Sequence, residues 1–389
     1  MKNISSFASE YDVIIVGARA AGAGTALLLG RAGLRVLMVD RGRYGSDTLS
    51  THALMRGGVL QLARWGVLPS VQDAGTPPVR RATFVYEGEA LSVPIKSRGG
   101  VDALYAPRRT VLDPILVDAA AAAGVDVAYG TALLNILRES DGRVSGVVLR
   151  GEWGRTERVM SRMVVGADGL RSLFGGLVNA ATTRAGTAAA ATVFGYWAGI
   201  GVDEYRWYYS PGLSAGAIPT NEGLTCIFAS VPANGFSDRF GGDVAGGYRR
   251  VLAEVAADLA GPMANGRLVG HLHGFPGHAG FLRRTTGRGW ALVGDAAYFK
   301  DPLTAHGITD ALIEAEYLAR AIATGSDAAL DAYADDRDRR AATIFEVTDR
   351  IASFDWSMDE ARALHKRLAE AMALEAKALD TLALEGAPA

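Results

Sequence analysis

The chain has 389 residues, of which 49% are hydrophobic and 21% are charged, and its formal net charge is -2. This length exceeds the usual size of a single hydrophobic core, so we expect two packed domains. A net charge so close to zero gives no electrostatic attraction for nucleic acid or for an anionic membrane surface. The one cysteine, Cys226, excludes an intramolecular disulfide and a CxxC redox pair, and we expect it to lie buried in a strand.

The N-terminal part of the chain predicts a strand, a turn, a helix and a second strand. Residues 11–17 (YDVIIVG) form an apolar run that ends in glycine, as a buried parallel strand does. Residues 20–32 are rich in Ala and Leu and predict a helix, and residues 34–40 (LRVLMVD) predict the next strand. Glycines and Arg19 interrupt the apolar stretch, so a βαβ unit fits it better than a membrane span. The first residues lack a sustained apolar signal core, and we expect a reducing, cytoplasmic location.

The rest of the chain predicts further helices, parallel strands and antiparallel strands. Residues 112–123 predict a helix, 125–165 predict a small antiparallel meander, and 164–169 (VVGADG) return to a parallel strand. Aromatic and β-branched residues at 190–231 predict a second, mostly β domain. Residues 289–295 (GWALVGD) predict another buried strand, followed by helices from 307 to the end. A capping box at 357–360 (SMDE) begins the last of these helices.

The first turn has the pattern of a dinucleotide-phosphate site. Gly17 and Gly22 provide a tight turn and close packing of helix on strand, while Arg19 stands where a middle glycine is usual. Asp40, at the end of the second strand and 18 positions after Gly22, is placed to accept hydrogen bonds from an adenosine ribose. The helix N-terminus adds about half a positive charge facing the phosphates. An acid at position 40 argues against a 2′-phosphate, but it does not separate NAD from FAD.

Two later motifs favour FAD. Residues 166–172 (GADGLRS) and 290–297 (WALVGDAA) both read as strand ends that carry an aspartate. With the first turn they occur in the order found in the group A FAD-dependent monooxygenases, the family built like para-hydroxybenzoate hydroxylase. The chain resembles that family from about residue 11 to about residue 321, most strongly at the three motifs and weakly in the β domain. The resemblance implies bound FAD, with NADH or NADPH as a transient electron donor, because no second nucleotide-binding turn is present.

The resemblance also assigns cofactor contacts. Asp295, preceded by Gly294, matches the residue that binds the ribityl hydroxyls and the pyrophosphate edge. Asp168 matches an aspartate linked to FAD and to NAD(P)H, and Arg109 matches an arginine on the pyrophosphate. Arg19 would help to screen the pyrophosphate, and Arg41, next to Asp40, completes this set of expected contacts.

Two further stretches look like segments that lie around the isoalloxazine in such proteins, namely 46–52 (SDTLSTH) and 300–310 (KDPLTAHGITD). In the second, Pro302 ends one segment and a helix begins near Gly307, so the free amides of Gly307 and Ile308 would face the pyrimidine end of the flavin. A helix N-terminus stabilises negative charge there by about 0.3–1 kcal/mol when exposed, and by more when dry.

His52 and His306 are the histidines that we expect to reach the active site, where either could shuttle a proton near neutral pH. The alternative for each is a hydrogen-bonded structural role. His271, His273 and His278 lie close together in sequence, and the first two would share one face of a strand. No cysteine or carboxylate pattern joins them, so we expect no metal site.

The expected fold is α/β, with a Rossmann-type, glutathione reductase-like FAD-binding domain, an inserted mostly β substrate domain and C-terminal helices. The FAD-binding domain would be discontinuous (1–76, 100–185 and 270–335). The β-rich substrate domain would take 77–99 and 186–269, and a helical region would take 336–389.

Four functions remain open at this point. The function that we expect first is a monooxygenase that uses NAD(P)H and O₂, through a flavin C4a-hydroperoxide, to hydroxylate or epoxidise an apolar, aromatic or polycyclic small molecule. The second is a reductase or dehydrogenase acting on a C=C bond, similar to the geranylgeranyl reductases. A flavin-dependent halogenase is disfavoured because the WxWxIP motif is missing. A flavoprotein without turnover is the fourth, and the protein could be a monomer or a homodimer.

Overall fold

The computed structural model describes residues 7–384, and its first layer is an eight-stranded sheet. Strand β1 (Glu10–Val16) lies at its centre and pairs in parallel with β2 (Val36–Val39) and β8 (Thr156–Gly166). Val13 and Ile15 point to one face of the sheet and Ile14 and Val16 to the other, and both faces are buried. This explains why β1 is apolar throughout instead of alternating.

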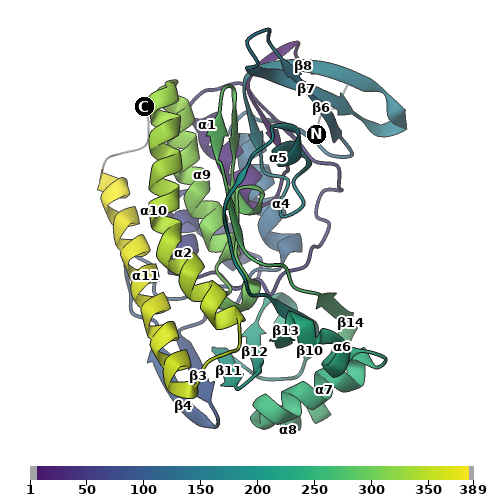
Figure 1. Ribbon diagram of the computed structural model, residues 1–389, viewed down its shortest axis with the longest axis vertical. Helices are drawn as coiled ribbons and strands as arrows, with labels where there is room; N and C mark the ends of the chain where they lie inside the picture. The colour runs from purple at the N-terminus through teal and green to yellow at the C-terminus, as the bar shows by residue number, and fades with distance from the viewer. Residues whose placement is uncertain (1–6, 385–389) are drawn as a thin grey trace.

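The sheet has the order β16-β17-β8-β1-β2-β5, and β6 and β7 extend it in an antiparallel meander beside β8. Its remaining strands are β5 (Asp126–Ala128), β6 (Ala132–Arg138), β7 (Val144–Arg150), β16 (Thr286–Gly287) and β17 (Trp290–Leu292). Helices cover the Val13 face: α1 (Ala20–Arg31), α4 (Arg109–Ala122) and α9 (Gly307–Thr324). The meander and the short α5 (Leu173–Leu177) cover the other face, seen at the upper right of Figure 1.

The second layer is a seven-stranded sheet of order β14-β10-β13-β12-β11-β3-β4, at the bottom of Figure 1. Its strands are β3 (Arg81–Tyr86), β4 (Glu89–Pro94), β10 (Ala190–Ala198), β11 (Tyr205–Ser210), β12 (Leu213–Pro219), β13 (Leu224–Pro232) and β14 (Arg267–Phe275). One face packs against α6 (Phe236–Phe240), α7 (Val244–Val255) and α8 (Ala260–Asn265). The opposite face belongs to the same hydrophobic core as α1, α4 and α9, so it faces the first domain.

Two long C-terminal helices join the domains. Helix α10 (Asp327–Ala352) packs on α9, and α11 (Met358–Leu384) packs on α10 and on α2 (Arg56–Arg64), along the left side of Figure 1. The predicted capping box is present, because the Ser357 amide donates to Glu360 Oε2 at 2.9 Å and the Glu360 amide to Ser357 Oγ at 3.3 Å. The shorter elements are α3 (Leu68–Asp73), β9 (Thr182–Ala185), β15 (Phe281–Arg283) and β18 (Tyr298–Phe299).

The α/β fold class, with a parallel-sheet cofactor domain, a β-rich insertion and C-terminal helices, is confirmed. The predicted domain boundaries stay a proposal. Strand β14 extends the inserted sheet to Phe275, past the predicted boundary at residue 269. The outer boundaries at residues 1 and 389 lie outside the described residues. Cys226 is buried in β13, as expected. Among residues 7–384 no helix is long and apolar enough to cross a membrane.

Candidate functional site

The turn between β1 and α1 needs glycine at two places. Gly17 has φ +110°, and a Cβ there would lie 2.3 Å from the carbonyl oxygen of Ala167. A Cβ on Gly22 would lie 1.9 Å from the carbonyl oxygen of Gly17. Arg19 has the extended φ of -98° that any residue adopts, which explains why the middle glycine can be absent.

The start of α1 is suited to an anion. Arg19 is its N-cap residue but makes no capping hydrogen bond, so the first-turn amides have no side-chain partner. The Arg19 guanidinium reaches sideways instead and donates to Asp113 Oδ2 at 3.1 Å and to the carbonyl of Asp47 at 3.2 Å. Arg109, the first residue of α4, also binds Asp113, with Nε 3.0 Å from Oδ1. The two arginines assigned to the pyrophosphate are therefore held by one carboxylate, Asp113, which the sequence reasoning did not single out.

Asp40 braces the same turn from the end of β2. Its Oδ2 accepts the Ala18 amide at 2.9 Å and its Oδ1 accepts the Gly42 amide at 2.7 Å. Each carboxylate oxygen has two lone pairs, so Asp40 can still accept a ribose hydroxyl. Arg41, beside it, is exposed.

Asp295 follows β17 and has no hydrogen-bond partner among the described residues. Burial raises its pKa to about 6, although the charges of Lys300 and Arg109 lower it. Gly294 places it, with φ +63° and an amide that donates to Glu314 Oε2 at 2.8 Å. A partly buried carboxylate without a hydrogen-bond donor is costly, and the hydroxyl groups of a bound cofactor would supply the donors. The residues present therefore fit FAD at this position.

Asp168, in contrast, has both oxygens in use within the protein. Oδ1 accepts the Ser172 hydroxyl at 2.5 Å, and Oδ2 accepts the Phe174 amide at 3.0 Å. Asp168 therefore fixes the turn after β8 and the start of α5. Its assigned link to FAD and NAD(P)H stays a prediction.

The segment before α9 brings the second predicted stretch beside Asp295. Pro302 begins a 3₁₀ turn (Pro302–Thr304), Ala305 is left-handed at φ +51°, and α9 starts at Gly307 without a side-chain cap. A Cβ on Gly307 would lie 3.9 Å from Asp295 Oδ1. The amides of Gly307 and Ile308 thus begin the helix close to Asp295, as an anion-stabilising helix end would.

His52, in the first predicted stretch, contacts the seven-stranded sheet. It is 1% exposed and left-handed at φ +69°, and its Nε2 lies 2.5 Å from the Tyr196 hydroxyl of β10. The Arg108 guanidinium covers the Tyr196 ring at 4.0 Å and pairs with Asp47 at 2.9 Å. Strain at a buried, non-glycine residue is a mark of functional segments. Burial, and then the charge of Arg109, lowers the pKa of His52 to about 3, so it is neutral at physiological pH.

His306 is directed toward the C-terminal helix. Its Nε2 lies 2.9 Å from Glu375 Oε2 of α11 and 3.5 Å from Asp310 Oδ1. The nitrogen and oxygen atoms of His306, Asp310 and Glu375 that could bind a metal lie within 4.8 Å of one another. The Lys300 ammonium already pairs with Asp310, so we describe this group as an ion-pair cluster and not as a metal site. His271 and His273 do share one face of β14, with ring centroids 4.4 Å apart.

The face of the seven-stranded sheet that looks toward this region is apolar and rich in rings. Its cross-strand neighbours, from β10 to β3, are the buried Phe194, Tyr196, Cys226, Phe228, Gly216, Ile218, Tyr205 and Trp207 and the half-buried Phe84. Phe84 stacks on Trp207 at 5.5 Å, and Phe194 meets Tyr196 edge-on at 6.1 Å. These side chains pack in the core shared with the first domain, and Tyr196 and His52 are polar groups at one end of this face.

Comparison with known proteins agrees with this geometry. The family model for the FAD binding domain matches residues 10–228, which is more than half of the chain. The chain belongs to this family. It is an FAD-dependent oxidoreductase in the broad sense, and FAD is its cofactor.

Relatives of this FAD-binding chain differ in their chemistry. It is 29% identical to the digeranylgeranylglycerophospholipid reductase of Methanosphaerula palustris over 365 residues, which cover 88% of this chain and 84% of the relative. The flavin-dependent brominase Bmp2 has a similar fold, with a TM-score of 0.77, 18% identity and coverage of 97% and 100% of the two chains. PqsL of Pseudomonas aeruginosa, described as a "probable FAD-dependent monooxygenase", gives a TM-score of 0.72 at 21% identity and covers 93% and 99%.

Proposed function

We propose that the protein is an FAD-dependent reductase that saturates a C=C bond in an apolar substrate, with NADH or NADPH as electron donor. The observation that carries this proposal is the buried, ring-rich face of the seven-stranded sheet opposite the cofactor-binding residues. The similarity to a reductase of isoprenoid chains along 88% of the sequence supports it.

The protein's own residues would bind, orient and enclose the reactants. The amides at the starts of α1 and α9 would hold the pyrophosphate and the pyrimidine edge, and Asp295 would accept the ribityl hydroxyls. FAD, when bound and reduced, supplies hydride to an acceptor. His52 and Tyr196 would orient the substrate or move a proton at the Tyr196 oxygen.

Hydroxylation or epoxidation of an aromatic or polycyclic substrate with O₂ is the second candidate. The favouring observation is the composition of the same sheet face, because stacked and edge-on rings such as Phe84, Trp207 and Phe194 also suit a planar ligand. It requires the same cofactor and the same electron donor.

Oxygen consumption separates the two. With FAD bound and NADPH present, a geranylgeranylated glycerophospholipid as probe should be turned over without any oxygen uptake beyond that of a substrate-free control. Oxygen uptake in proportion to product would favour the monooxygenase.

A further inference from the structure

A buried ionic cluster joins the start of α9 to the C-terminal helix. Lys300 pairs with Asp310, and His306 lies between Asp310 and Glu375. The side chains of Lys300 and His306 are 3% and 1% exposed, and those of Asp310 and Glu375 are each 9% exposed. Ion pairs so far from solvent are costly to form, so their presence beside the cofactor-binding residues calls for an explanation.

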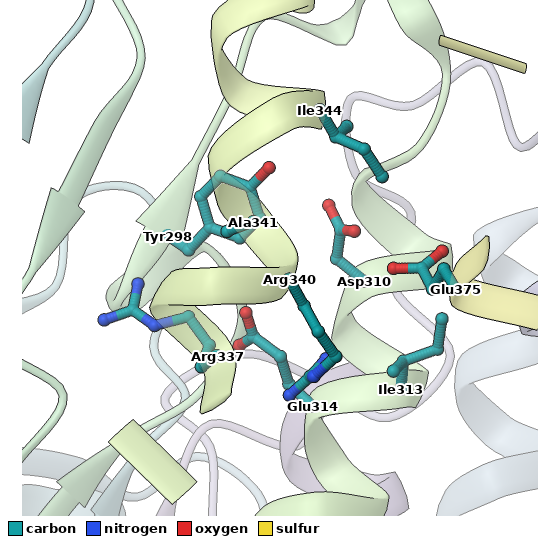
Figure 2. A pocket seen from close by; sticks show the side chains of 9 residues that line it. All are labelled: Tyr298, Asp310, Ile313, Glu314, Arg337, Arg340, Ala341, Ile344 and Glu375. Carbon is teal, nitrogen blue, oxygen red and sulfur yellow. The ribbon is translucent and has the colours of Figure 1, made fainter. Parts of the chain in front are cut away.

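A small cavity adjoins this cluster between α9, α10 and α11 (Figure 2). Figure 2 shows Asp310 and Glu375 on the side of α11 and Glu314 nearer to α10, and the cavity has room for about one water molecule. Arg337 and Arg340 of α10 also line it, but they pair with the carboxylates of Asp338 and Asp336 on their own helix, at 3.0 and 2.6 Å. Tyr298 of β18 completes the lining and remains protonated, because burial raises its pKa well above the ordinary value.

The charges nearest His306 do not balance. The Lys300 ammonium pairs with Asp310, whereas Glu375 has no ion-pair partner other than His306 among the described residues. Arg340, which lines the same cavity, pairs with Asp336, so Glu375 lacks a cation of its own. Burial raises the pKa of the nearby Glu314 carboxyl, while the charge of Arg337 and the Gly294 amide lower it. His306 can supply the missing charge by binding a proton, since its Nε2 already faces Glu375 and its buried Nδ1 has no partner among the described residues.

In the absence of further negative charge, burial disfavours protonation of His306. Burial lowers the pKa of His306, although Glu375 raises it, so the imidazole is neutral near pH 7. Burial raises the pKa of Glu375, but the hydrogen bond from His306 and the charges of Lys300 and Arg340 lower it, and His306 lowers it further once the imidazole is protonated. His306 is also the N-cap residue of α9, whose free amides begin beside Asp295, and negative charge that develops there on reduction of the cofactor raises the proton affinity of the imidazole.

We propose that His306, held by Glu375 of the C-terminal helix, takes up a proton when the bound FAD is reduced. The proposal rests on FAD binding at this site but not on whether the enzyme reduces or oxygenates its substrate. A hydride from NADH or NADPH would bring two electrons and one proton to the cofactor and leave one added negative charge. A second proton, taken from solvent, would bind to the imidazole and compensate that charge. Glu375 is then a positioning residue: it orients the imidazole and stabilises its cationic form. Helix α11 becomes part of the redox site although it lies outside the family match at 10–228.

The test is the reduction potential of the bound FAD as a function of pH, in the wild type and in the Glu375→Gln variant. We expect Glu375→Gln to lower the potential near neutral pH and to couple one proton fewer to each electron pair. Glu370→Gln is the matched control, because it removes the same charge from an exposed position on the same helix, and it should titrate like the wild type. Glu375→Asp, which keeps the charge, should restore at least part of the coupling.

Equal pH slopes in wild type and Glu375→Gln would overturn the proposal, because a merely structural glutamate would leave the proton count unchanged. If Glu375→Gln does not fold, His306→Gln is measured instead, and a wild-type slope in that variant overturns the proposal as well. Failure of the wild type to bind FAD would refute the proposed function itself, which distinguishes the two results.

Discussion

Replacing Asp295 should separate cofactor binding from the stability of the apoprotein. In the FAD-free protein the carboxylate has no hydrogen-bond donor, and its pKa rises from 3.8 to about 6. Two pKa units correspond to about 3 kcal/mol of destabilisation of the folded apoprotein by the ionised carboxylate. Because Asp295 is only partly buried, solvent screens its charge, and we expect about half of this destabilisation. Asp295→Ala should therefore make the apoprotein more stable by about 1–2 kcal/mol near pH 8.

The same substitution should weaken FAD binding. A hydrogen bond to a charged group contributes about 1.5–3 kcal/mol, and two cofactor hydroxyls on one carboxylate would make the loss at least about 100-fold in the dissociation constant. Denaturation of the apoprotein and fluorescence titration with FAD measure the two effects. Asp168→Ala is the contrast, because it leaves the Phe174 amide without its acceptor and should destabilise the apoprotein. Wild-type FAD affinity in Asp295→Ala would refute the assignment.

Four further outcomes are expected. FAD affinity should fall as pH falls through about 6, because protonated Asp295 no longer accepts as an anion, and an unchanged affinity between pH 8 and pH 5 would contradict this. Gly17→Ala should cost at least about 1–3 kcal/mol and release FAD, since φ +110° and the contact with Ala167 both exclude a side chain, whereas Gly176→Ala, with open space around it, should be tolerated in thermal denaturation. His52→Ala should retain FAD but slow turnover, and unchanged kinetics would make His52 structural. Burial lowers the pKa of His365 to about 4 in the folded protein, so the unfolded chain binds a proton at this residue more readily. The free energy of unfolding should therefore fall as pH falls from 6.5 toward 4, and His365→Gln should reduce that fall by up to about 3 kcal/mol in urea denaturation.

Local patterns made the cofactor domain predictable. The apolar run of β1 and the glycines at 17 and 22 each carry a backbone or packing requirement within a few residues, and the structure has the predicted strand and turn there. Asp40 lies at the end of β2 and accepts the Ala18 amide, and its contact with a ribose stays a prediction. Even the departure at Arg19 has a local reason, because the position needs no positive φ.

Long-range side-chain pairs could not be predicted in this way. The partner of His306 is Glu375, 69 positions later, and nothing in the helical pattern of α11 indicates which of its acids faces inward. Tyr196 lies 144 positions after His52, and the stacking of Arg108 on its ring depends on how the two domains pack. Asp113 reads as an ordinary helical acid until the fold brings Arg19 beside it.

The most direct measurement is to mix the FAD-loaded, anaerobically reduced protein with a geranylgeranylated glycerophospholipid in the absence of oxygen. A C=C reductase should reoxidise its cofactor at once, and the product should gain two hydrogen atoms per double bond in the mass spectrum. A cofactor that stays reduced until oxygen is admitted, with a product that gains an oxygen atom, would contradict the reductase and favour the monooxygenase.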